Sequence, residues 1–219
     1  MLGTSSVEPI SLRNQVADLI KDAMLSGKLK PGERIVELRL AKELGLGTTS
    51  IREALFQLER LGYVTRVLNK GAYVTELSPE DRRQIYTVRM ELEGLSAQLA
   101  AERREDLSLE PLQLAWDEMK SAAVSGKLDL FYECDLKFHR TVWKLGNNRY
   151  AIQFLESIVA PLFGFYVMRT HRSARQLLHE VDVHRAIMDA IRSETPAQAR
   201  QVMREKLHYY LGQEAVFLS

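Results

Sequence analysis

The sequence predicts a mainly α-helical chain, in which an N-terminal winged helix-turn-helix domain is followed by an all-α helical bundle. Three observations lead to this prediction. Between residues 35 and 75, two short helical patterns around a glycine-containing turn precede two strand-like runs. A strong helix start follows at Ser78-Pro79-Glu80-Asp81, and beyond it apolar residues recur only at helical spacing. We therefore expect two domains, residues 1–77 and 78–219.

Three helices should precede the strands of the first domain. The first helix ends at Gly27, and its apolar positions are Leu12, Val16, Leu19, Ile20, Ala23 and Met24. The second helix has one apolar face, made of Leu40, Ala41 and Leu44. The third helix repeats apolar residues at intervals of four, three and three, at Ile51, Leu55, Leu58 and Leu61. Gly62 should end this third helix.

The third helix and the strands after it have the order of a DNA-reading element. In a helix-turn-helix, the first turn of the second helix meets base edges and phosphates, and here that turn leaves polar side chains outward. The runs 63–67 and 72–75 should pair as a hairpin, the wing, across Asn69-Lys70-Gly71. The residues expected to contact DNA are Arg39, Thr48, Thr49, Ser50, Arg52, Lys70 and Gly71.

The second domain should consist of six or so helices. The first carries an apolar stripe at Ile85, Val88, Leu92, Leu95 and Leu99, and the others should span about 109–124, 130–145, 149–171, 174–191 and 196–218. Pro161 should bend the helix that contains it. Thr195 and Gln198 should form a capping box at the start of the last helix.

Composition narrows the class of protein. The chain has 30 Lys and Arg against 29 Asp and Glu, a net charge of +1, which excludes a polycation that coats DNA without specificity. The single cysteine, Cys134, excludes an intramolecular disulfide and fits a reducing compartment. There is no apolar run of about 20 residues and no signal-peptide arrangement. We expect a cytoplasmic protein with no membrane contact.

Polar residues fall on predicted core positions of the second domain. Asp135 and His139 are four residues apart on an apolar helix face, so both side chains should project inward on the same side. His184 lies on the apolar stripe of a later helix. Burying a carboxylate and two imidazoles costs several kcal/mol unless they are paired or coordinate something. A ligand or a metal is the natural compensation.

The first domain resembles the N-terminal domain of GntR-type bacterial transcriptional regulators. The resemblance is carried by Leu40-Ala41, Arg52-Glu53-Ala54-Leu55, Leu58-Glu59, Gly62 and Asn69-Lys70-Gly71-Ala72-Tyr73-Val74. The family usually has Ser-Arg-Thr-Pro-Val-Arg where this chain has Gly47-Thr48-Thr49-Ser50-Ile51-Arg52, so the operator sequence cannot be borrowed. The resemblance implies a regulator, with repression as the expected action, that binds a palindromic double-stranded operator as a homodimer.

The second domain resembles the effector domain of the FadR-type (FCD) branch of that family. The matching residues are Arg89 with Leu92-Glu93, Asp135-Leu-Lys-Phe-His139 and His184 to Ile191. In many members of that branch, one Asp and three His hold zinc or nickel and a carboxylate effector completes the shell. Three ligands match here, whereas the fourth would fall at Lys206, and His208 is off register.

The cluster therefore has open alternatives. Asp135, His139 and His184 bind a divalent metal, with water or a displaced His208 in the fourth position. Otherwise Lys206 replaces the metal, pairs with Asp135 and meets a small organic acid, or the polar core is merely satisfied. Arg89 either clamps the carboxylate of the effector or forms a salt bridge with Glu93. A metal-dependent enzyme built on the bundle is the alternative function, and it does not explain the first domain.

Overall fold

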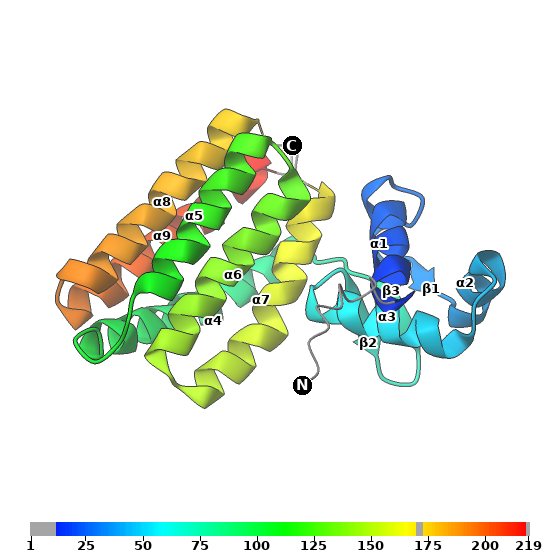
Figure 1. Cartoon of the computed structure of the whole chain (residues 1–219), viewed down its shortest axis with the longest axis horizontal. Coiled ribbons are helices and arrows are strands. Elements are labelled where there is room, and N and C mark those ends of the chain that lie inside the picture. The colour runs from blue at the N-terminus through cyan, green and yellow to red at the C-terminus, as the bar shows by residue number, and fades with distance from the viewer. Residues whose placement is uncertain (1–11, 170–172, 218–219) are drawn as a thin grey trace, which may run out of the picture. The chain divides into compact units, whose positions relative to one another are not determined.

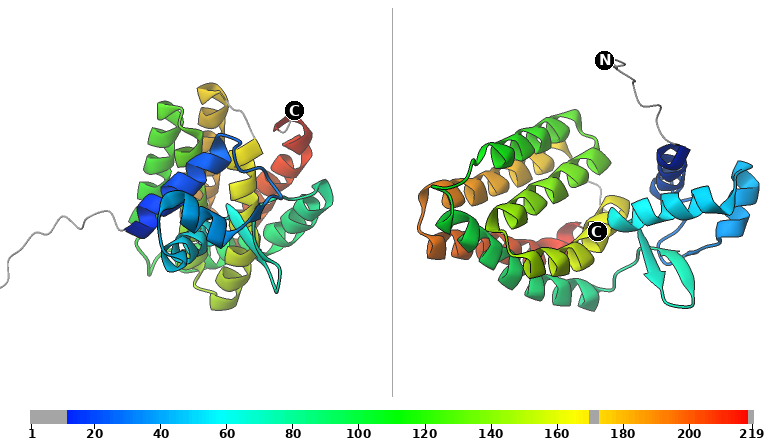
Figure 2. Two further views of the ribbon diagram at one scale, coloured as in Figure 1. Left: turned by 90° about the vertical axis from the view of Figure 1, so that its right-hand side faces the viewer. Right: turned by 60° about the horizontal axis from the view of Figure 1, so that its bottom comes forward.

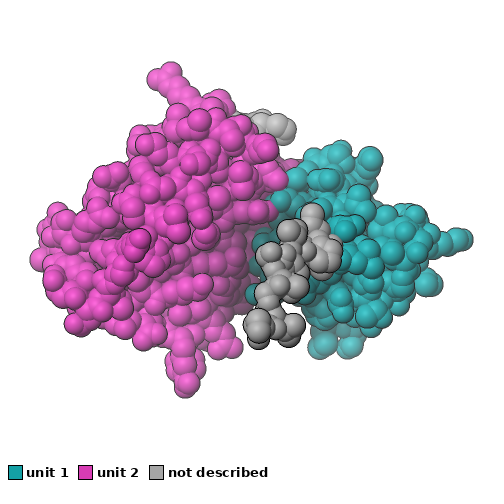
Figure 3. Space-filling view, in the orientation of Figure 1, with its two compact units in different colours: residues 1–76 teal, residues 77–219 magenta. Residues whose placement is uncertain are grey.

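The computed structural model of the protein describes residues 12–169 and 173–217, without the side chains of residues 213–217. The chain divides into two compact units, residues 1–76 and 77–219 (Figure 3). The first unit contains α1 (Leu12–Leu25), β1 (Arg34–Ile35), α2 (Glu37–Leu44), α3 (Thr48–Arg60), β2 (Val64–Val67) and β3 (Gly71–Val74). The second contains α4 (Pro79–Glu102), α5 (Glu110–Ser125), α6 (Leu128–Gly146), α7 (Arg149–Arg169), α8 (Ala174–Ser193) and α9 (Pro196–Phe217).

The first unit is a winged helix-turn-helix, as the sequence predicts. Helix α3 packs on both α1 and α2 and buries Ile51, Ala54, Leu55 and Leu58. The hairpin β2–β3 extends from these helices as the wing (Figure 2). Strand β1 pairs with β3 on its other side, which gives an antiparallel sheet in the order β1-β3-β2. The sequence analysis missed β1, because two residues are too few to show alternation.

Two turns of this unit need left-handed backbone. Gly45 ends α2 with φ 66°, and Asn69 and Gly71 adopt φ 62° and 103° in the turn of the wing. Glycine enters this region without steric penalty, and asparagine tolerates it better than most residues. These residues set the entry into α3 and the turn of the hairpin.

The second unit is a bundle of six helices within the described residues (Figure 1). Helix α4 packs against α9, α6 and α7, and α5 packs against α6 and α8. Gly146 lets α6 approach α4 closely, since a Cβ atom there would lie 2.6 Å from the backbone oxygen of Ser96. Ser78 and Asp81 form a capping box at the start of α4, and Thr195 and Gln198 bond reciprocally before α9.

All six predicted helices of the second domain are present. Pro161 lies inside α7, which continues through it. The predicted ends at His171 and Leu218 fall outside the described residues. Helix α7 is long and apolar enough to cross a membrane by length and composition, which the sequence analysis did not recognise. More than half of its most apolar window is buried within the protein, as in a core helix, so this is weak evidence for a membrane span.

The prediction for the buried face of α4 is wrong. The predicted stripe of Ile85, Val88, Leu92, Leu95 and Leu99 remains partly exposed, and Val88 is 48% exposed. The helix buries a face of polar and small residues instead, namely Arg82, Tyr86, Arg89, Glu93, Gly94, Ser96, Ala97, Ala100 and Ala101. The apolar stripe exists, but the rest of the protomer does not cover it fully.

Candidate functional site

The start of α3 presents polar side chains to the surface of the first unit. Thr49 and Arg52 are exposed, while Thr48 and Ser50 are half-buried. Ile51 is fully buried and anchors the same turn in the core. Gly47 caps the helix without a side-chain hydrogen bond. The polar face can therefore meet a ligand while the apolar face holds α3 in place.

Acidic neighbours engage both arginines that are expected to reach DNA. Arg52 donates from Nε and Nη2 to Oε2 of Glu37, at 3.1 and 2.9 Å. Arg39 lies within 3.4 Å of Glu33 and 3.8 Å of Glu43. All of these pairs lie at the surface, where such contacts contribute little to stability. These ion pairs orient the two guanidinium groups, and breaking the pairs when DNA binds costs little free energy.

The tip of the wing carries the other predicted contact residues. Lys70 and Gly71 are exposed at the turn between β2 and β3. Leu68 precedes them and is 87% exposed. The start of α3 and the wing tip are thus both accessible on the first unit.

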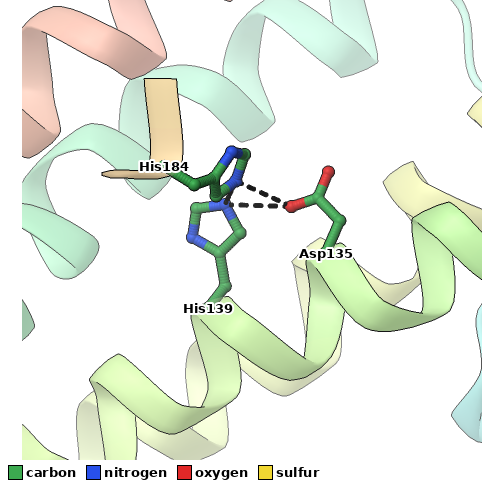
Figure 4. Close-up of side chains that lie close together, drawn as sticks. All are labelled: Asp135, His139 and His184. Carbon is green, nitrogen blue, oxygen red and sulfur yellow. Dashed lines mark hydrogen bonds and ion pairs between the residues drawn. The ribbon is translucent and has the colours of Figure 1, made fainter. Parts of the chain in front are cut away.

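A compact cluster of Asp135, His139 and His184 lies buried in the second unit (Figure 4). Asp135 and His139 lie one turn apart on α6, and His184 reaches them from α8. Nε2 of His184 is 2.9 Å from Oδ1 of Asp135 and 3.2 Å from Nε2 of His139. Nε2 of His139 is 3.5 Å from the same carboxylate oxygen. Three potential ligand atoms therefore converge from two helices.

The other ring nitrogen of each histidine fixes which atoms face the centre. Nδ1 of His184 is 2.7 Å from the backbone oxygen of Glu180, which can only accept, so this nitrogen carries the proton. Nδ1 of His139 faces Oε2 of Glu93 in the same way. When the two rings are neutral, both Nε2 atoms are then unprotonated, and each can offer its lone pair to a metal. Oδ1 of Asp135 is buried without a hydrogen-bond partner among the described residues.

Glu93 supports the cluster from α4. Its carboxylate is bonded to Arg89 and accepts from Nε1 of Trp143 at 3.1 Å. Burial opposes the charge on Glu93, but Arg89 and His139 outweigh that effect and lower its pKa to about 2. Arg89 stacks over the rings of Tyr86 and Phe163. Of the two roles predicted for Arg89, the salt bridge to Glu93 is present, and Arg89 also lines the cavity beside the cluster.

The pKa values of the three cluster residues reflect burial and mutual charge. Burial raises the pKa of Asp135, but the two histidines and Arg89 outweigh it and leave that pKa lowered. Burial lowers the pKa of His139, and Arg89 acts in the same direction. The pKa of His184 is raised against the effect of burial, because Asp135 and Glu180 favour its charged form. A proton on His184 is thus the competitor of a metal for this site.

The expected pairing of Lys206 with Asp135 is not what the structure shows. Asp135 lies against the two histidines, and Lys206 does not line the cavity. Among the described residues Lys206 is half-buried and His208 is exposed. Leu207 and Tyr210 form the wall from α9 instead. The prediction that Lys206 reaches the cluster is wrong because a different face of α9 points inward. That face carries Ala199, Met203, Leu207 and Tyr210.

The cavity beside the cluster has a volume of about 30 Å³, which is room for ordered water but not for a larger molecule. Its further walls are Tyr86, Tyr132, Phe163, Tyr166 and Glu180. The sequence-based prediction of the site did not include Glu180 and Tyr210. Glu180 precedes His184 by four residues, the same spacing as between Asp135 and His139, so this spacing could have predicted it.

Comparisons with protein families match both units. A model described as "Bacterial regulatory proteins, gntR family" matches residues 12–74, and one described as "FCD domain" matches residues 84–209.

Similar proteins align along most of their length. The chain is 29% identical over 191 residues to the uncharacterized HTH-type transcriptional regulator YdhC of Bacillus subtilis. This alignment covers 85% of this chain and 84% of YdhC. It is 26% identical over 201 residues to a probable D-xylose utilization operon transcriptional repressor of Paenarthrobacter nicotinovorans, covering 92% and 88%. Among solved structures, Escherichia coli McbR/YncC matches with a TM-score of 0.68 and 22% identity, over 94% of this chain and 100% of that chain. This last likeness shows a shared fold.

Proposed function

The chain belongs to the GntR family of bacterial regulatory proteins and carries an FCD domain over more than half of its length, and from this premise we propose how its two units act. It is a DNA-binding transcriptional regulator with an effector-binding domain. We assign operator reading to residues 1–77 and effector binding to residues 78–219, with repression as the expected action. The observation that carries the proposal is that one chain combines an exposed polar helix start with a buried cluster of three potential ligand atoms, from Asp135, His139 and His184.

Operator contact is assigned to α3 and to the wing. Thr48, Thr49, Ser50 and Arg52 would meet base edges and phosphates in the major groove, as the recognition helix of a helix-turn-helix does. Arg39 would reach phosphate or base, and Lys70-Gly71 would enter the adjacent groove. Exposure of the arginines and of the wing tip supports this assignment. The arginines would exchange their surface carboxylates for DNA.

The second unit is assigned a divalent metal, zinc or nickel. Asp135, His139 and His184 would hold it through one carboxylate oxygen and two Nε2 atoms. Carboxylate and imidazole suit both metals, and Glu93 with the Glu180 carbonyl would orient the rings from behind. The orphaned Oδ1 of Asp135 fits such a site. When bound, the metal would supply positive charge and open coordination positions for an oxygen of a small organic acid.

Effector binding would alter operator affinity by linkage. The effector changes the free-energy difference between the DNA-binding arrangement of the protein and the alternative arrangement. The size of this change equals the difference between the binding free energies of the effector for the two arrangements. The cavity has little room, so an effector must widen it by moving its walls, which include Leu207 and Tyr210 on α9. That movement is the structural change that the effector would impose on the bundle.

A homodimer is part of the proposal, because a two-fold protein matches a palindromic operator. The partly exposed apolar stripe of α4 is the surface we assign to the partner subunit. Burying it would remove the apolar area that the protomer leaves in water. A regulator that binds chromosomal DNA works in the cytoplasm. The enzyme alternative is set aside, since family membership accounts for both units.

A footprint on the DNA upstream of the gene for this protein tests the proposal. Two protected half-sites about one helical turn apart are expected, with the protection altered by candidate organic acids. Protection of random fragments at the same protein concentration would contradict sequence-specific reading.

A further inference from the structure

Two helices contribute the same pattern to the cavity of the second unit. Asp135 and His139 stand four residues apart on α6, and Glu180 and His184 stand four residues apart on α8. Both acid side chains are buried, Asp135 at 6% exposure and Glu180 at 5%. The ligand atoms that lie within 4.8 Å of one another belong to Asp135, His139 and His184, so Glu180 lies outside that group. Glu180 has another role in the same cavity.

Tyr210 faces the same cavity as this second carboxylate, from α9. Burial and the negative charge of Glu180 raise the pKa of the Tyr210 hydroxyl well above its ordinary value. The hydroxyl therefore keeps its proton and is available as a donor beside the carboxylate. Both residues line the cavity. They form an acceptor group about one helical turn from His184.

The charges around the cavity limit what can enter it. Among the described residues at the cavity and the cluster, three carboxylates, those of Glu93, Asp135 and Glu180, face one guanidinium, that of Arg89. Arg89 is already matched by Glu93. A divalent metal on the cluster brings this set to neutrality. A dianion would then leave two uncompensated charges in a buried site, whereas a molecule with one positive and one negative group leaves none.

We propose that Glu180, supported by Tyr210, binds a protonated amine on the effector, so the effector is a small amino acid rather than a dicarboxylate. The carboxylate end of the effector faces the cluster and Arg89, and the ammonium end faces Glu180. A charge-assisted hydrogen bond from ammonium to a buried carboxylate gives both affinity and discrimination. This inference rests on the proposed function, in that it takes the cavity as the effector site.

The test uses full-length protein with zinc and three probes on a three-carbon frame, which are β-alanine, 3-hydroxypropionate and malonate. Calorimetric titration should give the tightest binding for β-alanine and the weakest for malonate, at least about tenfold apart. Glu180→Gln, which keeps the shape of the side chain, should bring this ratio close to one without loss of zinc. Tyr210→Phe should reduce the ratio. Glu205→Gln, an exposed control on α9, should leave it unchanged.

Several results would overturn the inference. These are tighter binding of malonate than of β-alanine, an unchanged ratio in Glu180→Gln, or no binding of any probe to the wild type. Melting temperatures identify a variant that fails to fold, and Tyr210→Phe then carries the test. The operator footprint does not depend on Glu180. A protein that protects its operator and prefers malonate would retain the proposed function and refute the amine.

Discussion

Oδ1 of Asp135 lies 2.9 Å from Nε2 of His184, and both residues are buried. Because Nδ1 of His184 donates to the Glu180 carbonyl, the two atoms that face each other are both acceptors when the ring is neutral, and a proton on Nε2 or a metal cation must join them. His139 adds a third acceptor to the same point. This relationship is the physical basis of the metal assignment.

Metal content should depend on the cluster and not on nearby histidines. Protein purified without chelator should contain zinc or nickel at one ion per chain, measured by elemental analysis. His139→Ala and His184→Ala should lose it, whereas His208→Ala should keep it, since His208 is exposed. Removing a metal held at about 100-fold its Kd should lower stability by about 2.7 kcal/mol. Protein that is metal-free and indifferent to added zinc or nickel would contradict the assignment.

Glu93→Gln should strongly destabilise the bundle. The change leaves the guanidinium of Arg89 buried without its ion-pair partner, which typically costs about 3–5 kcal/mol. Glu91→Gln is the matched control, because Glu91 pairs with Arg200 and Arg204 at the surface. This substitution should lower the free energy of unfolding by about 1 kcal/mol or less. Urea denaturation of both variants measures the difference. Equal losses would show that the buried pair has no special role.

Gly146→Ala and Gly212→Ala should change stability in opposite directions. A Cβ atom on Gly146 would lie 2.6 Å from the Ser96 backbone oxygen, so α6 must shift away from α4 at a cost of about 1–3 kcal/mol. A Cβ atom on Gly212 meets nothing within 4 Å, and alanine in a helix is favoured over glycine by up to about 1 kcal/mol. Thermal unfolding compares them. A stable Gly146→Ala variant would mean that the two helices are farther apart.

Arg52→Ala should weaken operator binding while the melting temperature stays the same. Loss of one good base contact costs about 1–3 kcal/mol, or roughly 5- to 150-fold in Kd. Glu37→Gln should have the opposite effect, because it releases the guanidinium that Glu37 holds. Fluorescence anisotropy on the footprinted fragment at fixed salt gives both values. Unchanged affinity in Arg52→Ala would remove this residue from the interface.

The helices and the wing could be predicted from periodicity because their signals are local. The spacing of Ile51, Leu55 and Leu58 and the turn at Asn69-Lys70-Gly71 fix neighbouring backbone. Periodicity does not say what covers an apolar stripe. For α4 it marked Ile85 to Leu99, whereas the protomer buries the polar face with Arg89 and Glu93, which are tolerated there because they pair with each other.

The cluster could be predicted in part for the same reason. Asp135 and His139 share one helix, so their spacing places them together, and His184 occupies a core position of its own helix. The contribution of α9 depends on how that helix is rotated against α4 and α8. Sequence register pointed to Lys206, and packing places Leu207 and Tyr210 at the cavity. Rotation of that kind is set by long-range contacts that a local pattern does not contain.

Operator affinity measured with and without the metal and a small acid tests the central claim most directly. Full-length protein should bind the fragment upstream of its own gene much more tightly than a scrambled fragment. Titration with the acid should change that Kd only when Asp135, His139 and His184 are intact and metal-loaded. A Kd that responds equally in wild type and in His184→Ala, or no preference for the upstream fragment, would contradict the account.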